Sequence, residues 1–429
     1  MRAVITPHVF GGTVRVPASK SHTIRRLLIA SLTDGLSEID YPLDSLDARS
    51  CVSICRSMGA KIDETPDRWT IRGYKPLTKG NWGNPAEPKI LDVGNSGTTL
   101  FLALSAAALG TEPFVFTGDE QIKRRSAGPL LEALSALGIR VEVKGENGCA
   151  PILIQGPWKG GRVSLPCPTS QYLSSLLLAA PLAPAGTVTE IDVPLLNERP
   201  YIALTLSYLD AQKIPYKTND EFSFFHIDGG FSYKPLNGPV PGDFSSAAFP
   251  ACAAAISGGN LSLLGLDPED PQGDKLIFEI LARMGCEITW TTGHKPGEKC
   301  LQLSRSGPLR GGEFDLNAVP DLLPVLAVTA AFAEGDTALV NAAHARIKET
   351  DRIAVMAAEL EKLGVKCTER PDGLVIHGGG KVKGGIVDSH GDHRIVMAFA
   401  AAALAAQDPV EILGAEAARV TYPGFLDLL

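Results

Sequence analysis

The segment PVLAVTAAFAEGDTALV (Pro324–Val340) shows the pattern on which the fold prediction depends. An apolar, alanine-rich run that reads as a buried helix is followed by a Gly–Asp break and a short run of β-forming residues. Five other copies of this pattern occur, and the six begin at Leu27, Phe101, Leu176, Ala248, Pro324 and Val396. Successive starts lie 74, 75, 72, 76 and 72 residues apart. The sequence therefore predicts an α/β chain with a regular internal repeat.

A second helix and strand follow each of the first five copies, as in EKLGVKCTE around Gly364. The helix is amphipathic, and a glycine or aspartate stands at the break where left-handed geometry ends it. The repeat thus reads β-α-β-α-β. The sixth copy stops after its first half, so we expect the N-terminal segment Arg2–Pro17 to supply its missing strand.

A domain boundary is predicted midway along the chain. The run KPLNGPVPGD (Lys234–Asp243) holds three prolines and two glycines between the third and fourth copies. This divides the chain into residues 20–236 and a second domain of residues 1–19 plus 237–429, with three repeats in each. Two connections between two domains suit closure around a ligand.

Composition excludes several classes of protein. With 40 basic and 48 acidic residues among 429, the net charge of −8 argues against a nucleic-acid binder or a protein that binds anionic membranes. The longest apolar run, Ile395–Ala406, is shorter than the ~18 residues that a membrane-spanning helix needs. Eight cysteines without a CxxC pair favour free thiols in the reducing cytoplasm, and the histidine spacing predicts no metal site.

Polar residues gather just before each of the six apolar helices. They lie in the segments Ser19–Arg25, Gly94–Thr99, Pro168–Gln171, Gly242–Ser246 and Gly391–Arg394, and at Asp321. The unpaired N–H groups of a helix start attract anions, although serine, threonine and aspartate there could serve only as N-caps. Their recurrence at six equivalent positions, with Lys20, Arg25 and Arg394 among them, favours a site for anions.

Two further charged segments lie outside this pattern. One is IKRRSAGPL, which contains Arg125, and the other is RIKETDRIAVM, which contains Lys348, Glu349 and Arg352. In isolation, Glu349 and Arg352 would be an ordinary i,i+3 pair on a solvated helix. Beside the other cations they supply guanidinium groups, an ammonium group and a carboxylate, as phosphate and carboxylate chemistry requires.

In these motifs and their order the chain resembles the 5-enolpyruvylshikimate-3-phosphate synthase family, the 3-phosphoshikimate 1-carboxyvinyltransferases. The motifs are SKSHTIR (19–25), GNSGTT (94–99), SQ (170–171), RPYI (199–202), KETDRI (348–353) and GDHR (391–394). The resemblance spans Lys20 to Phe425. It implies a two-domain inverse α/β barrel of six β-α-β-α-β-β repeats, with the active site in the cleft between the domains. It further implies a monomer that needs no metal and no cofactor.

The resemblance also implies a reaction. The 5-hydroxyl of 3-phosphoshikimate adds to C2 of phosphoenolpyruvate while C3 gains a proton. Phosphate then leaves and C3 loses a proton, which completes a step of the shikimate pathway toward the aromatic amino acids. Such chemistry depends on positioning, electrostatic stabilisation and proton transfer.

Site residues are carried over from the matching motifs. Those implied for 3-phosphoshikimate are Lys20, Ser21, Arg25, Thr169, Ser170, Gln171, Tyr201, Asp321 and Lys348. Those implied for phosphoenolpyruvate, whose site the inhibitor glyphosate would share, are Lys20, Gly97, Arg125, Gln171, Arg352, His393 and Arg394. The catalytic set is Lys20, Asp321, Lys348 and Glu349, with Asp321 as the base and Glu349 for proton transfer at C3.

Four residues depart from the family pattern, namely Phe101, Glu198, His344 and Val420. Phe101 replaces an arginine, His344 an asparagine, and Val420 a lysine that some members have. Glu198 stands where a serine often binds the phosphate of shikimate. Because a carboxylate cannot donate a hydrogen bond to phosphate, we expect Glu198 to turn away or to pair with Arg199.

Two alternative functions remain at this point. The sister UDP-N-acetylglucosamine enolpyruvyl transferases usually carry Lys-Asn where this chain has Lys20-Ser21. They also have a reactive cysteine in a loop whose equivalent here, residues 118–128, contains none. The other alternative is a non-catalytic anion-binding relative, or one acting on RNA ends. A binding protein would not need both Asp321 and Glu349, and the acidic net charge argues against RNA.

Overall fold

Alanine-rich segments form helices that are buried on nearly every side. In the computed structural model, which describes residues 1–74, 87–293, 295 and 297–429, all residues of α9 (Leu323–Ala331) and α11 (His393–Ala403) are buried. In α7 (Phe244–Ser257) only the last residue is not. A helix that is apolar all round can only be stable inside a core, so these helices form the interior and the amphipathic ones cover it.

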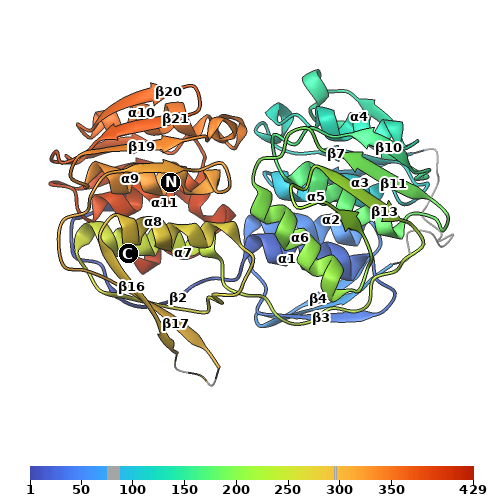
Figure 1. The fold of residues 1–429 in the computed structure, drawn as a ribbon, viewed down its shortest axis with the longest axis horizontal. Coiled ribbons are helices and arrows are strands. Elements are labelled where there is room, and N and C mark those ends of the chain that lie inside the picture. Colours follow the sequence, from blue (N-terminus) through green and yellow to red (C-terminus); the bar gives the residue numbers. More distant parts are fainter. Residues whose placement is uncertain (75–86, 294, 296) are drawn as a thin grey trace. The chain divides into compact units, whose positions relative to one another are not determined.

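The chain divides into two compact units, which are coloured by sequence in Figure 1. One unit is Lys20–Val240, and the other combines Met1–Ser19 with Pro241–Leu429. The predicted border after residue 236 is four residues too early. Asn237–Pro239 is not a free linker, because it forms strand β14, which pairs in parallel with β3 (Leu36–Asp40) of the first unit.

Among its described residues, the unit Lys20–Val240 contains three four-stranded sheets and their helices. The helices are α1 (Lys20–Ser31), α2 (Leu46–Ser57), α3 (Gly97–Ala107), α4 (Gly128–Ala136), α5 (Gln171–Ala179) and α6 (Arg199–Ala211). In sheet order, the strands are β14, β3, β5 (Arg68–Arg72) and β4 (Lys61–Glu64); β6 (Lys89–Asp92), β7 (Phe114–Thr117), β9 (Ile152–Gln155) and β8 (Arg140–Val143); and β10 (Gly161–Ser164), β11 (Val188–Asp192), β13 (Phe224–Asp228) and β12 (Lys217–Thr218).

The other unit contains the remaining described elements. Besides α7, α9 and α11, its helices are α8 (Leu276–Arg283), α10 (Arg352–Lys362) and the short α12 (Phe425–Leu428). In sheet order, its strands are β2 (Gly12–Arg15), β15 (Leu261–Leu264), β17 (Lys299–Arg305) and β16 (Cys286–Thr292); β18 (Glu313–Asp315), β19 (Asp336–Val340), β21 (Gly373–His377) and β20 (Lys366–Arg370); and β22 (Gly385–Asp388), β23 (Val410–Leu413) and β1 (Arg2–Ile5).

All six sheets follow one pairing rule. The first strand in the order above runs parallel to the second, which pairs antiparallel with the third. The N-terminal segment supplies two of these strands. β1 pairs antiparallel with β23, and β2 pairs in parallel with β15. The mixed α/β class expected from the sequence is confirmed.

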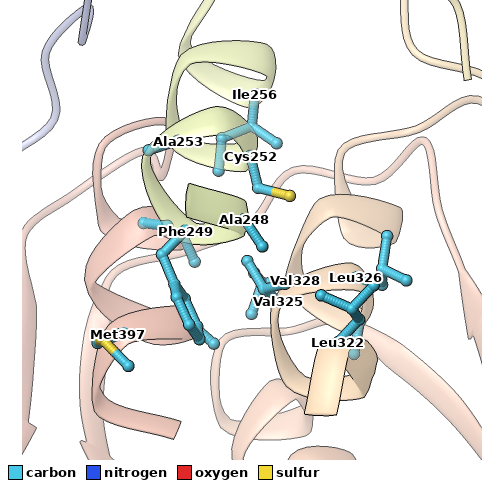
Figure 2. Close-up of a cluster of buried hydrophobic side chains, with 14 of the residues drawn as sticks. Ala248, Phe249, Cys252, Ala253, Ile256, Leu322, Val325, Leu326, Val328 and Met397 are labelled. Atoms are coloured by element: carbon cyan, nitrogen blue, oxygen red, sulfur yellow. The ribbon is translucent and has the colours of Figure 1, made fainter. Parts of the chain in front are cut away.

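The cores are built on close helix contacts. Figure 2 shows Ala248 and Phe249 of α7 facing Val325 and Val328 of α9, with Met397 of α11 beside them. In Figure 1 these three helices lie between the sheet of β16 and β17 and the sheet of β19 to β21. Alanine at the contacts lets helix backbones approach, so their first turns are brought close together as well.

The other unit has a polar contact inside its core. The buried Ser175 hydroxyl of α5 donates a hydrogen bond of 2.6 Å to the carbonyl oxygen of Phe101 in α3. It also lies 2.6 Å from the hydroxyl oxygen of Ser105. These bonds satisfy buried hydroxyls and hold α3 against α5. No helix among the described residues is long and apolar enough to cross a membrane.

We predict that Ala248→Leu lowers the free energy of unfolding by about 1–3 kcal/mol, because the added atoms must be accommodated between α7 and α9. The matched control is Ala282→Leu on the exposed face of α8, where a change within about 0.5 kcal/mol is expected. Urea unfolding of the two variants measures the difference. Equal losses in both would contradict close packing at Ala248.

Candidate active site

The starts of α9, α10 and α11 meet at one carboxylate, that of Asp321, in the turn Pro320–Leu322 directly before α9. Its Oδ1 accepts a hydrogen bond of 2.8 Å from Nη1 of Arg352, the first residue of α10. Its Oδ2 accepts one of 2.8 Å from Nη2 of Arg394, in the first turn of α11. Two residues predicted for phosphoenolpyruvate are thus bound to the predicted base.

Arg352 is buried, with only 1% of its side chain exposed, and carboxylates surround it. Nε and Nη2 donate to the two carboxylate oxygens of Asp392 over 2.8 and 3.2 Å, and Nη2 also donates to Glu349 over 2.5 Å. Burial alone would lower the pKa of Arg352, but Asp392, Glu349 and Asp321 raise it overall. The guanidinium therefore stays charged inside the protein.

Asp321 is held in its ionised form. Burial opposes ionisation, but Arg394, Lys348 and Arg352 together lower the pKa of Asp321 well below its ordinary value. An acidic carboxyl of this kind is a weak base while all three cations face it. Any ligand that draws the cations away would raise the pKa of Asp321 and strengthen it as a base.

The remaining predicted residues of this unit lie around the same carboxylate. Lys348 Nζ is 3.9 Å from Asp321 Oδ1. The buried His393 begins α11, with Nδ1 3.9 Å from Oδ1 of Asp392. The cluster contains three cations and three carboxylates, namely Lys348, Arg352, Arg394, Asp321, Glu349 and Asp392. The formal charges of this cluster sum to zero. An anionic ligand would therefore have to bind the cations in place of carboxylates that already pair with them.

In the unit Lys20–Val240 the starts of α1, α2 and α3 are joined. Lys20, the first residue of α1, forms an ion pair of 3.1 Å with Asp47 in the first turn of α2. The backbone oxygen of Asp47 accepts a 3.4 Å hydrogen bond from the hydroxyl of Thr99, which lies in the first turn of α3. The lysine predicted to contact both substrates therefore has a carboxylate partner.

Arg25 is buried and fully engaged with its own unit. Nε donates to the hydroxyl of Thr205 over 3.0 Å, and Nη2 contacts the hydroxyl of Ser174 at 3.3 Å and the backbone oxygen of Tyr201 at 3.4 Å. Nη1 donates to the backbone oxygen of Ser21 over 3.2 Å. Burial lowers the pKa of Arg25 to about 10, which leaves it charged at neutral pH.

Gly97 begins α3 beneath the guanidinium of Arg125. A Cβ atom at Gly97 would lie 2.2 Å from Nη1 of Arg125, which is closer than two atoms can approach without a shift. The absence of a side chain at this position therefore lets Arg125 cover the helix start.

The structure corrects the prediction for Glu198. Glu198 does not turn away from the hydroxyls predicted to bind phosphate, and the guanidinium carbon of Arg199 lies 4.8 Å from the centre of the Phe222 ring. Oε2 of Glu198 accepts hydrogen bonds from the Thr169 hydroxyl at 3.0 Å, from the Ser170 hydroxyl at 2.9 Å and from the Ser170 N–H at 3.0 Å. These are the groups predicted to receive the phosphate of 3-phosphoshikimate.

Two neighbours of these hydroxyls were also predicted as site residues. Gln171 begins α5, and its Nε2 lies 3.2 Å from the hydroxyl oxygen of Thr169. Tyr201 lies in the first turn of α6, directly after Glu198 and Arg199-Pro200, and its N–H donates to the backbone oxygen of Glu198 over 3.0 Å. The structure therefore brings Thr169, Ser170, Gln171 and Tyr201 together.

The other departures from the family pattern are structural. Phe101 is buried, and its ring meets that of Tyr172 edge to face with centres 5.2 Å apart. His344 is buried with Nε2 3.1 Å from the backbone oxygen of Asn317. Val420 is 9% exposed. An aromatic contact inside the unit Lys20–Val240 thus accounts for Phe101.

Sequence reasoning missed three carboxylates as parts of the site. Asp47 pairs with Lys20, Asp392 pairs with Arg352, and Glu198 binds Thr169 and Ser170. The rule that buried charges are paired could have raised Asp392, which is 0% exposed and lies inside the GDHR motif. In the part of the chain that the structure describes, no three metal-ligating side chains are grouped as a site for an ion.

Fold and site together define a class, an α/β protein whose helix starts bring cations, hydroxyls and carboxylates together. The model of one family, EPSP synthase (3-phosphoshikimate 1-carboxyvinyltransferase), matches residues 5–429. The chain therefore belongs to the EPSP synthase family. Its predicted activity, enolpyruvyl transfer in the shikimate pathway, is confirmed with the family.

Proteins related to this chain can be aligned with nearly its whole length. The 3-phosphoshikimate 1-carboxyvinyltransferase of Acetivibrio thermocellus is 47% identical over 97% of this chain and 95% of its own. That of Ruminiclostridium cellulolyticum is 45% identical over 97% and 94%. A solved EPSP synthase from Acinetobacter baumannii is similar with a TM-score of 0.80 and 30% identity, covering 100% of this chain and 97% of that one.

We predict that Asp392→Asn lowers the free energy of unfolding by about 2–4 kcal/mol, because it removes one charge from a buried pair and leaves Arg352 with weaker partners. Urea unfolding measures the loss. The control Asp408→Asn replaces an exposed aspartate of the same unit and should change stability by less than about 0.5 kcal/mol. Similar stability of the two variants would show that Asp392 does not anchor Arg352.

Proposed function

We propose that the chain transfers the enolpyruvyl group of phosphoenolpyruvate to the 5-hydroxyl of 3-phosphoshikimate and releases phosphate, with the residues described above in defined roles. The observation that carries the proposal is the pairing of Arg352 and Arg394 with one carboxylate, that of Asp321. An anionic substrate can bind the guanidinium groups of Arg352 and Arg394 in place of Asp321. The Asp321 carboxylate is then available to accept a proton.

Phosphoenolpyruvate is assigned to the cations. Its carboxylate and phosphate would bind Arg352 and Arg394 from one unit and Arg125 and Lys20 from the other. Gly97 would leave room for it, and Gln171 and His393 would border it. Guanidinium groups suit this substrate because their paired N–H groups match carboxylate and phosphate oxygens.

3-Phosphoshikimate is assigned to the hydroxyl groups of the unit Lys20–Val240. Thr169 and Ser170 would bind its phosphate, with Gln171 and Tyr201 beside them. Lys20, Ser21 and Arg25 would hold the rest of the molecule. From the other unit, Asp321 and Lys348 would reach the 5-hydroxyl.

The chemistry needs proton transfers at the 5-hydroxyl and at C3, and no covalent enzyme intermediate. Asp321 would accept the proton of the 5-hydroxyl as its oxygen attacks C2, and Glu349 in its protonated form would deliver a proton to C3. In the second step Glu349 would take a proton back from C3 while the C2–O bond to phosphate breaks, and the proton held by Asp321 would leave with the phosphate. Lys20 and Lys348 would stabilise the charge that develops on the oxygens.

Asp321 acquires its basicity from the substrate in this scheme. Arg394, Lys348 and Arg352 lower the pKa of Asp321 against the opposing effect of burial. When phosphoenolpyruvate takes the two arginines, the same carboxyl loses most of the positive charge that held its pKa down. The base would therefore become active only after phosphoenolpyruvate is in place.

Several expectations from the sequence belong to the same proposal. The six sheets with their helices would be six copies of a β-α-β-α-β-β unit in an inverse α/β barrel, three in each domain. The residues of the two units would act on the substrates in one cleft between them. The enzyme would work as a monomer in the cytoplasm.

The experiment that tests this function is an assay of phosphate release from phosphoenolpyruvate, run separately with 3-phosphoshikimate and with UDP-N-acetylglucosamine. Release with 3-phosphoshikimate alone is expected. Release with the sugar nucleotide alone would assign the chain to the sister transferases. No release with either would leave an anion-binding relative without this activity.

We predict that Glu349→Gln lowers kcat by about 100-fold or more, because a general acid–base group is lost, while both KM values change little. Steady-state phosphate release provides the numbers. Glu361→Gln, an exposed glutamate of α10, is the matched control and should retain full activity. A Glu349→Gln enzyme that turns over at the parental rate would remove Glu349 from the chemistry.

Gly97→Ala should raise the KM for phosphoenolpyruvate and weaken inhibition by glyphosate, because its methyl group would collide with the Arg125 guanidinium, 2.2 Å away. The long side chain of Arg125 can move aside, so stability should change by less than about 1 kcal/mol. Inhibition curves and melting temperatures test both statements. Gly307→Ala, with no atom within 4 Å of the new Cβ, is the control. An unchanged inhibition constant would show that Gly97 does not border the site.

A further inference from the structure

Glu198 is buried, with 2% of its surface exposed. One oxygen, Oε2, accepts three hydrogen bonds, from two hydroxyls and one backbone N–H of Thr169 and Ser170. Three donors at 2.9 to 3.0 Å around one oxygen form a complete set for an anionic oxygen. The carboxylate of Glu198 is therefore bound as a ligand would be.

The backbone fixes Glu198 in this position. The N–H of Cys167 donates to the backbone oxygen of Leu195 over 2.8 Å, and that of Asn197 donates to the backbone oxygen of Cys167 over 3.1 Å. This short parallel pairing sets the segment before α6 beside the segment before α5. Glu198 itself is left-handed, with φ 57° and ψ 40°, as the chain turns into α6. The contact thus follows from the pairing of two segments and not from a single side-chain rotamer.

From these contacts we infer that Glu198 is a specificity-determining residue, an internal anion that occupies the phosphate-binding groups of Thr169 and Ser170 until substrate displaces it. The inference rests on the proposed function, which assigns these groups to the phosphate of 3-phosphoshikimate. A phosphate and the Glu198 carboxylate cannot share the same donors, because both are anions and each donor has one proton to give. Binding of 3-phosphoshikimate is therefore an exchange of one anion for another.

The exchange has a measurable consequence for affinity. The protein must break three charge-assisted hydrogen bonds to Glu198 before it can form equivalent bonds to the substrate phosphate. The cost of breaking these bonds reduces the binding free energy that the substrate phosphate contributes. The same competition acts on inorganic phosphate, which carries the recognised group without the ring.

Two variants remove the charge in different ways. Glu198→Asn shortens the side chain and places a residue that tolerates left-handed geometry at this position. Glu198→Gln keeps the length and removes only the charge. The matched control is Glu221→Asn, since Glu221 is an exposed glutamate of the same unit and its loss changes the net charge equally.

The expected result is a KM for 3-phosphoshikimate that falls about tenfold in Glu198→Asn, because the internal competitor is gone. The KM for phosphoenolpyruvate and the kcat should stay within twofold of the Glu221→Asn control. A loss of structure alone would instead lower kcat and disturb both KM values. Glu198→Gln, which retains the packing, should also lower the KM for 3-phosphoshikimate.

Calorimetric titration with inorganic phosphate tests the inference without turnover. Tighter phosphate binding in Glu198→Asn or Glu198→Gln than in the parent supports it, even if the parent proves inactive with 3-phosphoshikimate and the proposed function fails. Phosphate affinity and KM for 3-phosphoshikimate that are unchanged or weaker in both variants, with melting temperatures near that of the parent, would overturn it.

Discussion

Close packing of buried, small-residue helices is the constraint on which the rest of this structure depends. Helices such as α7 and α9 approach each other because alanine lines their contacts, and a polar side chain within them, such as Thr329, bonds to the backbone of its own helix. The charged groups then lie at the helix starts, where backbone N–H groups lack partners. Asp321, Arg352 and Arg394 lie together because α9, α10 and α11 begin near one another.

The charged groups of the candidate site are paired with one another. Lys20 is matched by Asp47, Arg352 by Asp392, and the hydroxyls of Thr169 and Ser170 by Glu198. Buried cations without partners would be costly, so the protein supplies carboxylates of its own. In the proposed function, substrate affinity is therefore a difference between two sets of ion pairs. The same arrangement lowers the pKa of Asp321, because Arg394, Lys348 and Arg352 outweigh the effect of burial.

Much of the fold could be predicted from the sequence because buried helices and the strands after them leave a periodic local pattern. The helix starts followed from the same pattern, and the motifs predicted the residues expected at the site. What could not be predicted depends on distant pairing. The hydrogen bond from Thr169 to Glu198 requires the register that joins Cys167 to Leu196, and β14 joins β3 across about 200 residues. Local periodicity carries no information on such partners, so it does not reveal that Asn237–Pro239 belongs to the first unit.

The position of β1 has a consequence for how the chain can be made. Its partner is β23, so Arg2–Ile5 leave the ribosome long before Val410–Leu413 and wait until those residues have been synthesised. The segment Lys20–Val240 can meanwhile complete its three sheets, because all their strands lie within it. Translation would therefore produce one folded unit beside a β1 strand that has no partner yet, and a chain truncated before Val410 would leave β1 exposed to other strand edges.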